Sequence, residues 1–250
     1  MTPTLVVSPS VAQAVRDSAE HVVTIAQKSI AARGKFSLAL AGGSTPKALY
    51  QLLAGDEFCS QIDWSKAHIF FGDERAVPTH HEYSNARMAR EALLDHVPVP
   101  RDNIEYMVSD VPDLDASARA YEMQLRGVAG RLDLVLLGMG DDGHTASLFP
   151  GYDALTENAR WCVATDVSPT EPRLPRLTLT LPCINAARSV LVLVTGQSKA
   201  LRVAQAMQQL QASTRSDETL PIARVQPGDG ELVWVLDEAA GRLLGDGKEA

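Results

Sequence analysis

The stretch that decides the fold is LDLVLLGMGDDGHTASLFPG, residues 132–151. It opens with a short run rich in Leu and Val, 132–137, which is typical of a strand buried on both faces of a parallel sheet. Three glycines within 138–143 then allow the backbone to turn sharply. The turn carries Asp141, Asp142 and His144. Because open α/β sheets bind ligands at the carboxyl ends of their strands, we expect the chemistry here.

The rest of the chain alternates strand and helix patterns. Buried or short strands are predicted at 5–7, 36–41, 69–71, 132–137, 161–165, 189–195 and 232–236, a half-buried strand at 177–181 and a short one at 102–107. Helices are predicted from Ser10 to Gly34 and at 48–53, 85–94, 116–125, 145–148 and 198–210, with loops at 168–175 and 212–219, then a short helix and a frayed tail after 236. This alternation predicts an α/β fold. We expect one doubly wound, mostly parallel, Rossmann-like sheet with helices on both faces, and a single domain over residues 1–250.

Composition limits the class of protein. The net charge of −8 argues against nucleic acid or an anionic membrane as the main partner, although a local basic site can still hold a small anion. Cys59, Cys162 and Cys183 form neither a close pair nor a metal-ligand spacing, which predicts buried thiols in a reducing compartment. The sequence shows no signal-peptide pattern and no apolar stretch long enough to span a bilayer. We therefore expect a cytoplasmic protein.

A glycine-rich turn, Gly42-Gly43-Ser44-Thr45-Pro46, follows the predicted strand 36–41. The glycines allow close approach of a ligand to the backbone, Ser44 or Thr45 can cap the following helix, and Pro46 suits its first turn. Free backbone N–H groups and the helix dipole favour an anion such as phosphate. The alternative is an ordinary tight turn with a capped helix. The spacing differs from that of a Walker loop.

The second glycine-rich turn, 138–143, fits the pattern G-x-G-x-x-G. Its two acids would repel a pyrophosphate, so it does not favour dinucleotide binding. Histidine titrates near neutral pH, so His144 is a candidate general base that Asp142 could orient. The alternative is a histidine that only caps the turn. The position at the carboxyl end of a buried strand favours the catalytic interpretation.

Further charged candidates follow other predicted strands. Asp73 and Arg75 come after the strand 69–71. Arg75 can hold a phosphate or carboxylate with two hydrogen bonds, and Asp73 could transfer a proton or bind sugar hydroxyls. A solvated loop salt bridge is the competing interpretation. Additional cationic candidates are Arg173, Arg176 and Lys199. The adjacent His80 and His81 lack metal-ligand spacing, so no metal is predicted.

Three blocks together resemble the 6-phosphogluconolactonase family. They are LALAGGSTPKALYQLL at 38–53, FFGDERAVPTHHEYSNARMARE at 70–91 and LDLVLLGMGDDGHTASLFPG at 132–151. The pieces PRLTLTLPCINAAR at 175–188 and VTGQSKA at 194–200 are also similar to that family. The likeness runs over most of the chain in one order and spacing.

The resemblance implies an activity and a set of site residues. It implies hydrolysis of 6-phospho-D-glucono-1,5-lactone, a step of the oxidative pentose phosphate pathway, without cofactor or metal. His144 would be the general base, with Asp142 beside it and Asp73 as a further catalytic candidate. Phosphate binding would fall to the turn and cations formed by Gly42, Gly43, Ser44, Thr45, Arg75, Arg176 and Lys199. The expected partner is a small phosphorylated sugar lactone, not nucleic acid or a membrane, and the protein is expected to be a monomer or a homodimer.

Two alternatives remain at this point. The same superfamily contains glucosamine-6-phosphate deaminases, whose pattern places a glutamate one residue before the proline, where this chain has Phe149, and a tyrosine where it has Arg75. Both departures match the lactonase pattern. The other alternative is a sugar-phosphate sensor without catalysis, for which His144 and Asp142 would not be needed.

Overall fold

The computed structural model describes residues 2–212, 216 and 218–245, and their strands form two sheets. The larger sheet is parallel throughout, with the order β1 (Thr4–Ser8), β9 (Glu231–Asp237), β8 (Ser189–Val194), β5 (Leu134–Leu137), β2 (Phe36–Leu40), β3 (Ala67–Phe71). The smaller sheet is antiparallel, with the order β4 (Asp73–Arg75), β7 (Arg176–Leu179), β6 (Cys162–Thr165). The predicted α/β class with a mostly parallel sheet is confirmed.

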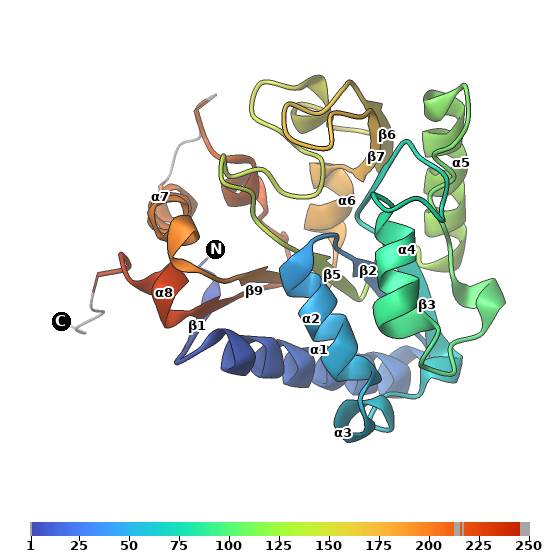
Figure 1. The fold of residues 1–250 in the computed structure, drawn as a ribbon, viewed down its shortest axis with the longest axis horizontal. Helices are drawn as coiled ribbons and strands as arrows, with labels where there is room; N and C mark the ends of the chain where they lie inside the picture. The colour runs from blue at the N-terminus through green and yellow to red at the C-terminus, as the bar shows by residue number, and fades with distance from the viewer. Residues whose placement is uncertain (1, 213–215, 217, 246–250) are drawn as a thin grey trace.

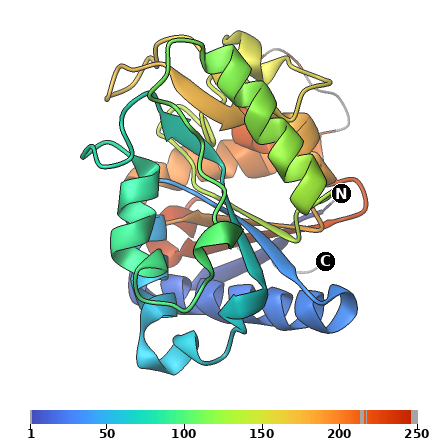
Figure 2. The same ribbon diagram turned by 90° about the vertical axis from the view of Figure 1, so that its right-hand side faces the viewer.

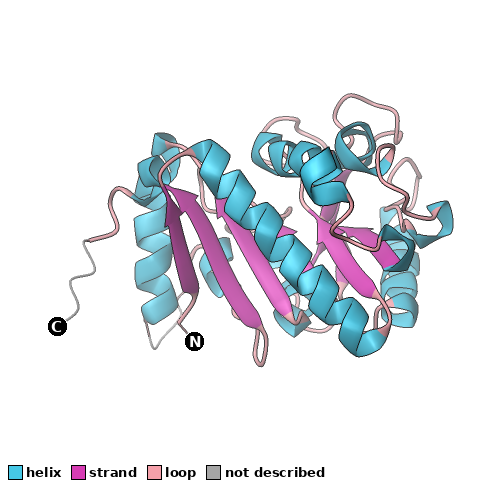
Figure 3. Cartoon of the chain, turned by 90° about the horizontal axis from the view of Figure 1, so that it is seen from below, coloured by secondary structure: helices cyan, strands magenta, loops and turns pink. Residues whose placement is uncertain are grey.

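Helices cover the sheets on different sides. They are α1 (Val11–Arg33), α2 (Ser44–Ala54), α3 (Asp56–Cys59), α4 (Asn85–Ala89) with a π turn (Arg90–Leu94), α5 (Leu114–Val128), α6 (Leu181–Ala186), α7 (Ala200–Gln211) and α8 (Glu238–Gly241). In Figure 1, α1 lies on one side of the larger sheet and α6 on the other. Figure 3 shows α1 running across the strands, and Figure 2 shows α5 against the smaller sheet.

Helix α1 has the ends that its sequence predicts. The Ser10 hydroxyl accepts a hydrogen bond from the Gln13 amide, and Gly34 closes the helix in the left-handed region at φ 74°. Its buried face consists mainly of small and β-branched residues such as Ala14, Ala19 and Val22. Small side chains let the helix axis lie close to the sheet, so α1 fixes one face of the core.

Strand β5 lies between β8 and β2, and its side chains are all buried. It starts at Leu134, two residues later than predicted, because the side chain of the preceding Asp133 is engaged in hydrogen bonds. The Asp133 carboxylate accepts hydrogen bonds from the amide and hydroxyl of Ser37 and from the Arg33 guanidinium. A buried carboxylate needs such partners. They tie the start of β5 to β2 and so fix where β5 ends, at the turn that carries His144.

The smaller sheet corrects two predictions. Residues 73–75, predicted as a loop, form β4, and the strand predicted at 177–181 is β7, which is buried on both faces instead of half-buried. The alternation of Leu and Thr in residues 177–181 predicts a strand with one solvent-exposed face. However, α5 packs against this sheet, and Thr178 accepts a hydrogen bond from the Ser147 amide, so both faces are covered.

Two further local predictions are wrong. Residues 145–148 form a turn instead of a helix, because the amide and hydroxyl of Ser147 bond to the neighbouring β7 and β4 and Ala146 adopts a positive φ of 47°. Residues 102–107 contain a 3-10 turn (Arg101–Asn103) and a single bridge between Ile104 and Ile69 instead of a strand.

The remaining predictions concern cysteines, termini and location. Cys162 and Cys183 are buried as expected, whereas Cys59 is half-buried, and no disulfide joins them. The short helix predicted after the last strand is α8, while parts of the loop predicted at 212–219 and of the frayed tail lie outside the described residues. Among the described helices, none is both long and apolar enough to cross a membrane. The cytoplasmic location and the oligomeric state stay predictions.

Candidate active site

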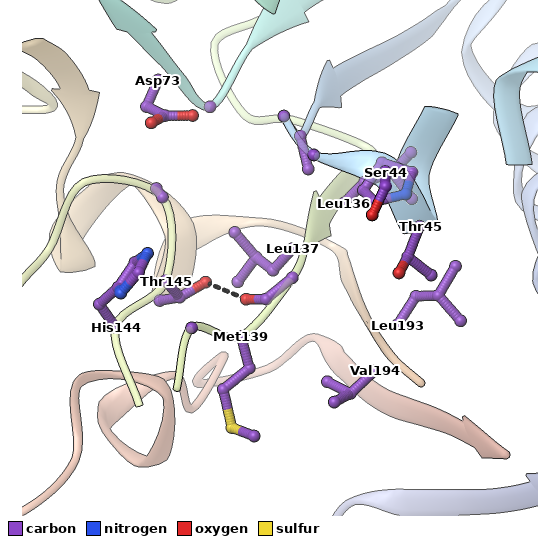
Figure 4. Close-up of a pocket in the computed structure, with 18 of the residues that line it drawn as sticks. Ser44, Thr45, Asp73, Leu136, Leu137, Met139, His144, Thr145, Leu193 and Val194 are labelled. Carbon is purple, nitrogen blue, oxygen red and sulfur yellow. Dashed lines mark hydrogen bonds between the residues drawn. The ribbon is translucent and has the colours of Figure 1, made fainter. Parts of the chain in front are cut away.

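A cavity of about 270 Å³ opens at the carboxyl ends of β2, β5 and β8. Its lining includes nine of the residues singled out from the sequence, namely Gly42, Gly43, Ser44, Thr45, Asp73, Arg75, His144, Arg176 and Lys199. Asp142 does not line it but contacts His144. In Figure 4, Asp73 and His144 lie on one side of the cavity and Ser44 and Thr45 on the other, with Leu137 and Met139 between them. The cavity therefore has two chemically different ends.

The first end is the amino terminus of α2. Gly43 is the N-cap residue, at φ 105°, and no side chain caps the helix, so the predicted cap by Ser44 or Thr45 is wrong. The first-turn amides thus stay open toward the cavity, as in anion sites at helix termini. A Cβ at Gly42 would lie 2.2 Å from Asn85 Oδ1, so this position needs glycine for close packing.

Lys199 approaches the same cavity from the turn after β8. The hydroxyl of Thr195, at the end of β8, lies 3.2 Å from that of Thr45, which places this turn beside the start of α2. Lys199 Nζ lies 2.6 Å from Asp141 Oδ1, and Arg202 donates a hydrogen bond to the Asp141 carbonyl. Asp141 thus holds the ammonium of Lys199 at the cavity.

The second end contains the predicted catalytic pair. His144 Nδ1 lies 2.6 Å from Asp142 Oδ1, and the His144 amide donates to the same oxygen. Partial burial raises the pKa of the Asp142 carboxyl, but the hydrogen bonds from the ring and amide of His144 outweigh it and hold that pKa below its usual value. An ionised Asp142 accepts a hydrogen bond from Nδ1–H of His144, which leaves the lone pair of the neutral imidazole on Nε2.

Two neighbours fix the plane of the His144 ring. A Cβ at Gly140 would lie 2.1 Å from both Nδ1 and Cε1, so the ring rests directly on the backbone of the turn. On another side the buried ring of Phe149 packs at 4.4 Å between centroids and 41° between planes. The imidazole therefore has little freedom to rotate away from Asp142.

Asp73 is buried beside this pair, and its carboxylate is fully engaged. Asn85 Nδ2 donates to Oδ1 at 2.9 Å, and Ser147 Oγ donates to Oδ2 at 2.6 Å. Arg176 Nη1 lies 3.8 Å from Oδ2. These contacts favour a role for Asp73 in holding the site together over the proton transfer considered from the sequence.

Arg75 and Arg176, which line the cavity, are both positioned by hydrogen bonds from their guanidinium groups to neighbouring oxygens. Arg75 Nη1 donates to the Tyr83 carbonyl at 2.6 Å. Arg176 is 3% exposed, its Nη2 donates to Ser168 Oγ, and its guanidinium lies 5.5 Å from the centre of the Phe149 ring. Burial lowers the pKa of Arg176 from its ordinary value, and Asp73 partly opposes this shift.

The structure places one sequence candidate, Arg173, outside the cavity and shows three site residues that the sequence did not indicate. Arg173 is 72% exposed, pairs with Glu171 and does not line the cavity. Asn85, Ser147 and Thr195 were missed, because each acts through a partner far away in the chain. No three His, Cys, Asp or Glu side chains in the described ranges are grouped to hold a metal ion.

The chain is similar over most of its length to known proteins. The family described as glucosamine-6-phosphate isomerases/6-phosphogluconolactonase matches residues 9–234. A 6-phosphogluconolactonase of Synechocystis sp. is 43% identical over 230 residues, covering 89% of this chain and 90% of the relative. One of Nostoc sp. is 40% identical over 255 residues, covering 98% and 99%. The solved structure of 6-phosphogluconolactonase from Trypanosoma cruzi superimposes with a TM-score of 0.84 at 32% identity, covering 98% and 99%.

Proposed function

We propose that this chain, which belongs to the family of glucosamine-6-phosphate isomerases and 6-phosphogluconolactonases, hydrolyses 6-phospho-D-glucono-1,5-lactone with His144 as the general base. The lactonase class is supported by relatives at 40–43% identity that carry this name. The role of the histidine is supported above all by one observation, the 2.6 Å contact between His144 and Asp142 at the edge of the cavity. A protein that only bound its ligand would not need this pair.

The substrate would be held at its phosphate by the first end of the cavity. The open amides at the start of α2 and the ammonium of Lys199 offer hydrogen-bond donors and positive charge. Arg75 and Arg176 line the rest of the cavity and make it locally positive within a protein whose net charge is −8. The lactone ring would then extend from this end toward His144.

The reaction uses one base in two steps. Nε2 of His144 takes a proton from water, the water oxygen forms a bond to C1, and the carbonyl electron pair moves onto the carbonyl oxygen. That pair then returns as the bond from C1 to the ring oxygen breaks, and His144 gives its proton to the departing ring oxygen. The product is 6-phosphogluconate. A positioned base of this kind contributes about 10²–10⁴-fold to the rate.

The deaminase alternative is not favoured by the geometry. At the position where deaminases carry a glutamate, this chain has Phe149, a fully buried ring beneath His144 and Arg176. It offers no carboxylate for ring opening or proton transfer. Ammonia release from glucosamine 6-phosphate by the wild type tests this alternative, and we expect none above the uncatalysed rate.

The test replaces the proposed base and measures turnover. Formation of 6-phosphogluconate from freshly generated lactone is followed for the wild type and for His144→Gln, with the uncatalysed reaction as baseline. We expect kcat to fall by about 10²–10⁴-fold with KM nearly unchanged. His80→Gln is the control, since His80 is exposed and does not line the cavity. A His144→Gln enzyme with near-normal kcat removes His144 from this role, and a wild type without activity on lactone refutes the lactonase function.

A further inference from the structure

The cations of the cavity are divided between its two ends. Ser44 and Thr45 mark the phosphate end in Figure 4, and Lys199 belongs with it, because the turn after β8 meets Thr45 through Thr195. Arg176, by contrast, contacts Asp73 and the Phe149 ring, at the other end. Phe149 is also the ring on which His144 packs.

We propose, on the basis of the proposed lactonase function, that Arg176 acts at C1 of the substrate and not at its phosphate. It stabilises the negative charge that forms on the carbonyl oxygen when water attacks, and it binds the C1 carboxylate of the product. This division of labour differs from the resemblance to the lactonase family, which placed Arg176 among the phosphate-binding cations.

Hydrogen bonds from Nη2 fix the guanidinium of Arg176 in position for this role. Nη2 donates to Ser168 Oγ at 3.0 Å and to the Pro172 carbonyl at 3.3 Å, so the guanidinium is anchored through this nitrogen. Nη1 donates no hydrogen bond within the described part of the chain, although Arg176 lines the cavity. The buried Nε of Arg176 also has no hydrogen-bond partner among the described residues, and an unpaired buried donor is costly unless a ligand oxygen reaches it.

The Asp73 carboxylate balances the buried positive charge of Arg176 without accepting a hydrogen bond from Nη1. Its oxygens already accept hydrogen bonds from Asn85 and Ser147, and Oδ2 lies 3.8 Å from Nη1, too far for a hydrogen bond. The carboxylate therefore lowers the cost of burying the guanidinium while Nη1–H remains open to an oxygen on C1. A donor that is already held in place before the reaction stabilises a developing oxyanion.

The test compares two ligands that differ only at C1. 6-Phosphogluconate carries a carboxylate there, whereas sorbitol 6-phosphate carries a hydroxymethyl group. Binding of each is measured by calorimetric titration to the wild type, Arg176→Gln and Lys199→Ala. We expect Arg176→Gln to weaken 6-phosphogluconate by about 10–100-fold and sorbitol 6-phosphate by less than about threefold, as for loss of a hydrogen bond to a charged group. Lys199→Ala should weaken both ligands to a similar extent.

Kinetics on the lactone give a second readout. Arg176→Gln should lower kcat by about 10²–10³-fold with little change in KM, as when an oxyanion donor is removed. Arg173→Gln is the control, because Arg173 lies in the same loop region but is exposed and outside the cavity. If thermal melting shows that Arg176→Gln does not fold, Arg176→Lys is measured instead. Lysine keeps the positive charge but lacks the paired N–H donors of the guanidinium.

Two outcomes overturn the inference. Equal weakening of both ligands in the folded Arg176 variant assigns Arg176 to the phosphate, and unchanged binding of 6-phosphogluconate removes it from the C1 site. Both outcomes are independent of whether the wild type hydrolyses the lactone, so failure of the inference and failure of the proposed function can be distinguished.

Discussion

Replacement of Gly140 by alanine tests whether the position of the His144 ring determines the rate. The φ of Gly140 lies outside the left-handed region, so the backbone itself accepts alanine. The added Cβ, however, would lie 2.1 Å from Nδ1 and Cε1 of His144, where an ordinary contact begins at 3.4 Å. The ring must therefore retreat by about 1.3 Å, the difference between these two distances.

That displacement is large compared with what the site tolerates. It breaks or lengthens the 2.6 Å contact with Asp142 and moves Nε2 away from the attacking water. A misplacement of about 1 Å can cost 10²-fold in rate, so we expect kcat to fall by about 10²-fold. The phosphate end is untouched, so KM should stay within about threefold. The imidazole can swing toward the cavity, so the loss of stability should be near 1 kcal/mol, the lower end for overpacking.

The assay compares kcat, KM and the thermal midpoint of Gly140→Ala with those of the wild type. Gly127→Ala is the matched control, because Gly127 is an exposed position of helix α5 and a Cβ there meets nothing within 4 Å. It should keep wild-type kinetics. If Gly140→Ala has a wild-type kcat, or raises KM instead of lowering kcat, the explanation by ring position is refuted.

Two further predictions concern stability. The lowered pKa of Asp142 means that its carboxylate stabilises the fold above its unfolded-state pKa of about 3.9 and loses this contribution as the pH falls through the folded-state pKa. The difference in Tm between wild type and Asp142→Asn should therefore shrink below about pH 4, and a difference that grows there would contradict the assignment. Tyr50→Phe removes a buried hydroxyl that both donates to the Ala41 carbonyl and accepts from the Ala41 amide. We expect a loss of about 1–3 kcal/mol in denaturant unfolding, and an unchanged midpoint would show that these bonds contribute nothing.

The sequence predicted the larger sheet well because its signals are local. Strands such as β5 and β8 are continuous apolar runs, and α1 carries its own cap at Ser10 and its own stop at Gly34. The smaller sheet could not be predicted in the same way. Its strand β4 has only three residues, and the burial of β7 depends on what packs against it, including the Ser147 turn.

In the candidate site, too, contacts between residues close in the chain could be predicted and contacts between distant residues could not. His144 and Asp142 are two residues apart, so their contact follows from the turn, and the start of α2 is recognisable from its glycines. Asp73 and Ser147, by contrast, are 74 residues apart, and their hydrogen bond exists only after β4, β7 and the turn have assembled. No spacing in the sequence indicates such a contact.

The sequence by itself determined the α/β class, the two glycine-rich turns and nine of the residues that line the cavity. These depend on apolar periodicity and backbone freedom over a few neighbouring residues, which the chain encodes locally. Only the tertiary structure decided that Asp73 is locked by Asn85 and Ser147, and that Arg176 lies with His144 on the Phe149 ring. The physical reason is that the roles of these groups depend on distance and burial, which arise when segments far apart in the chain pack together.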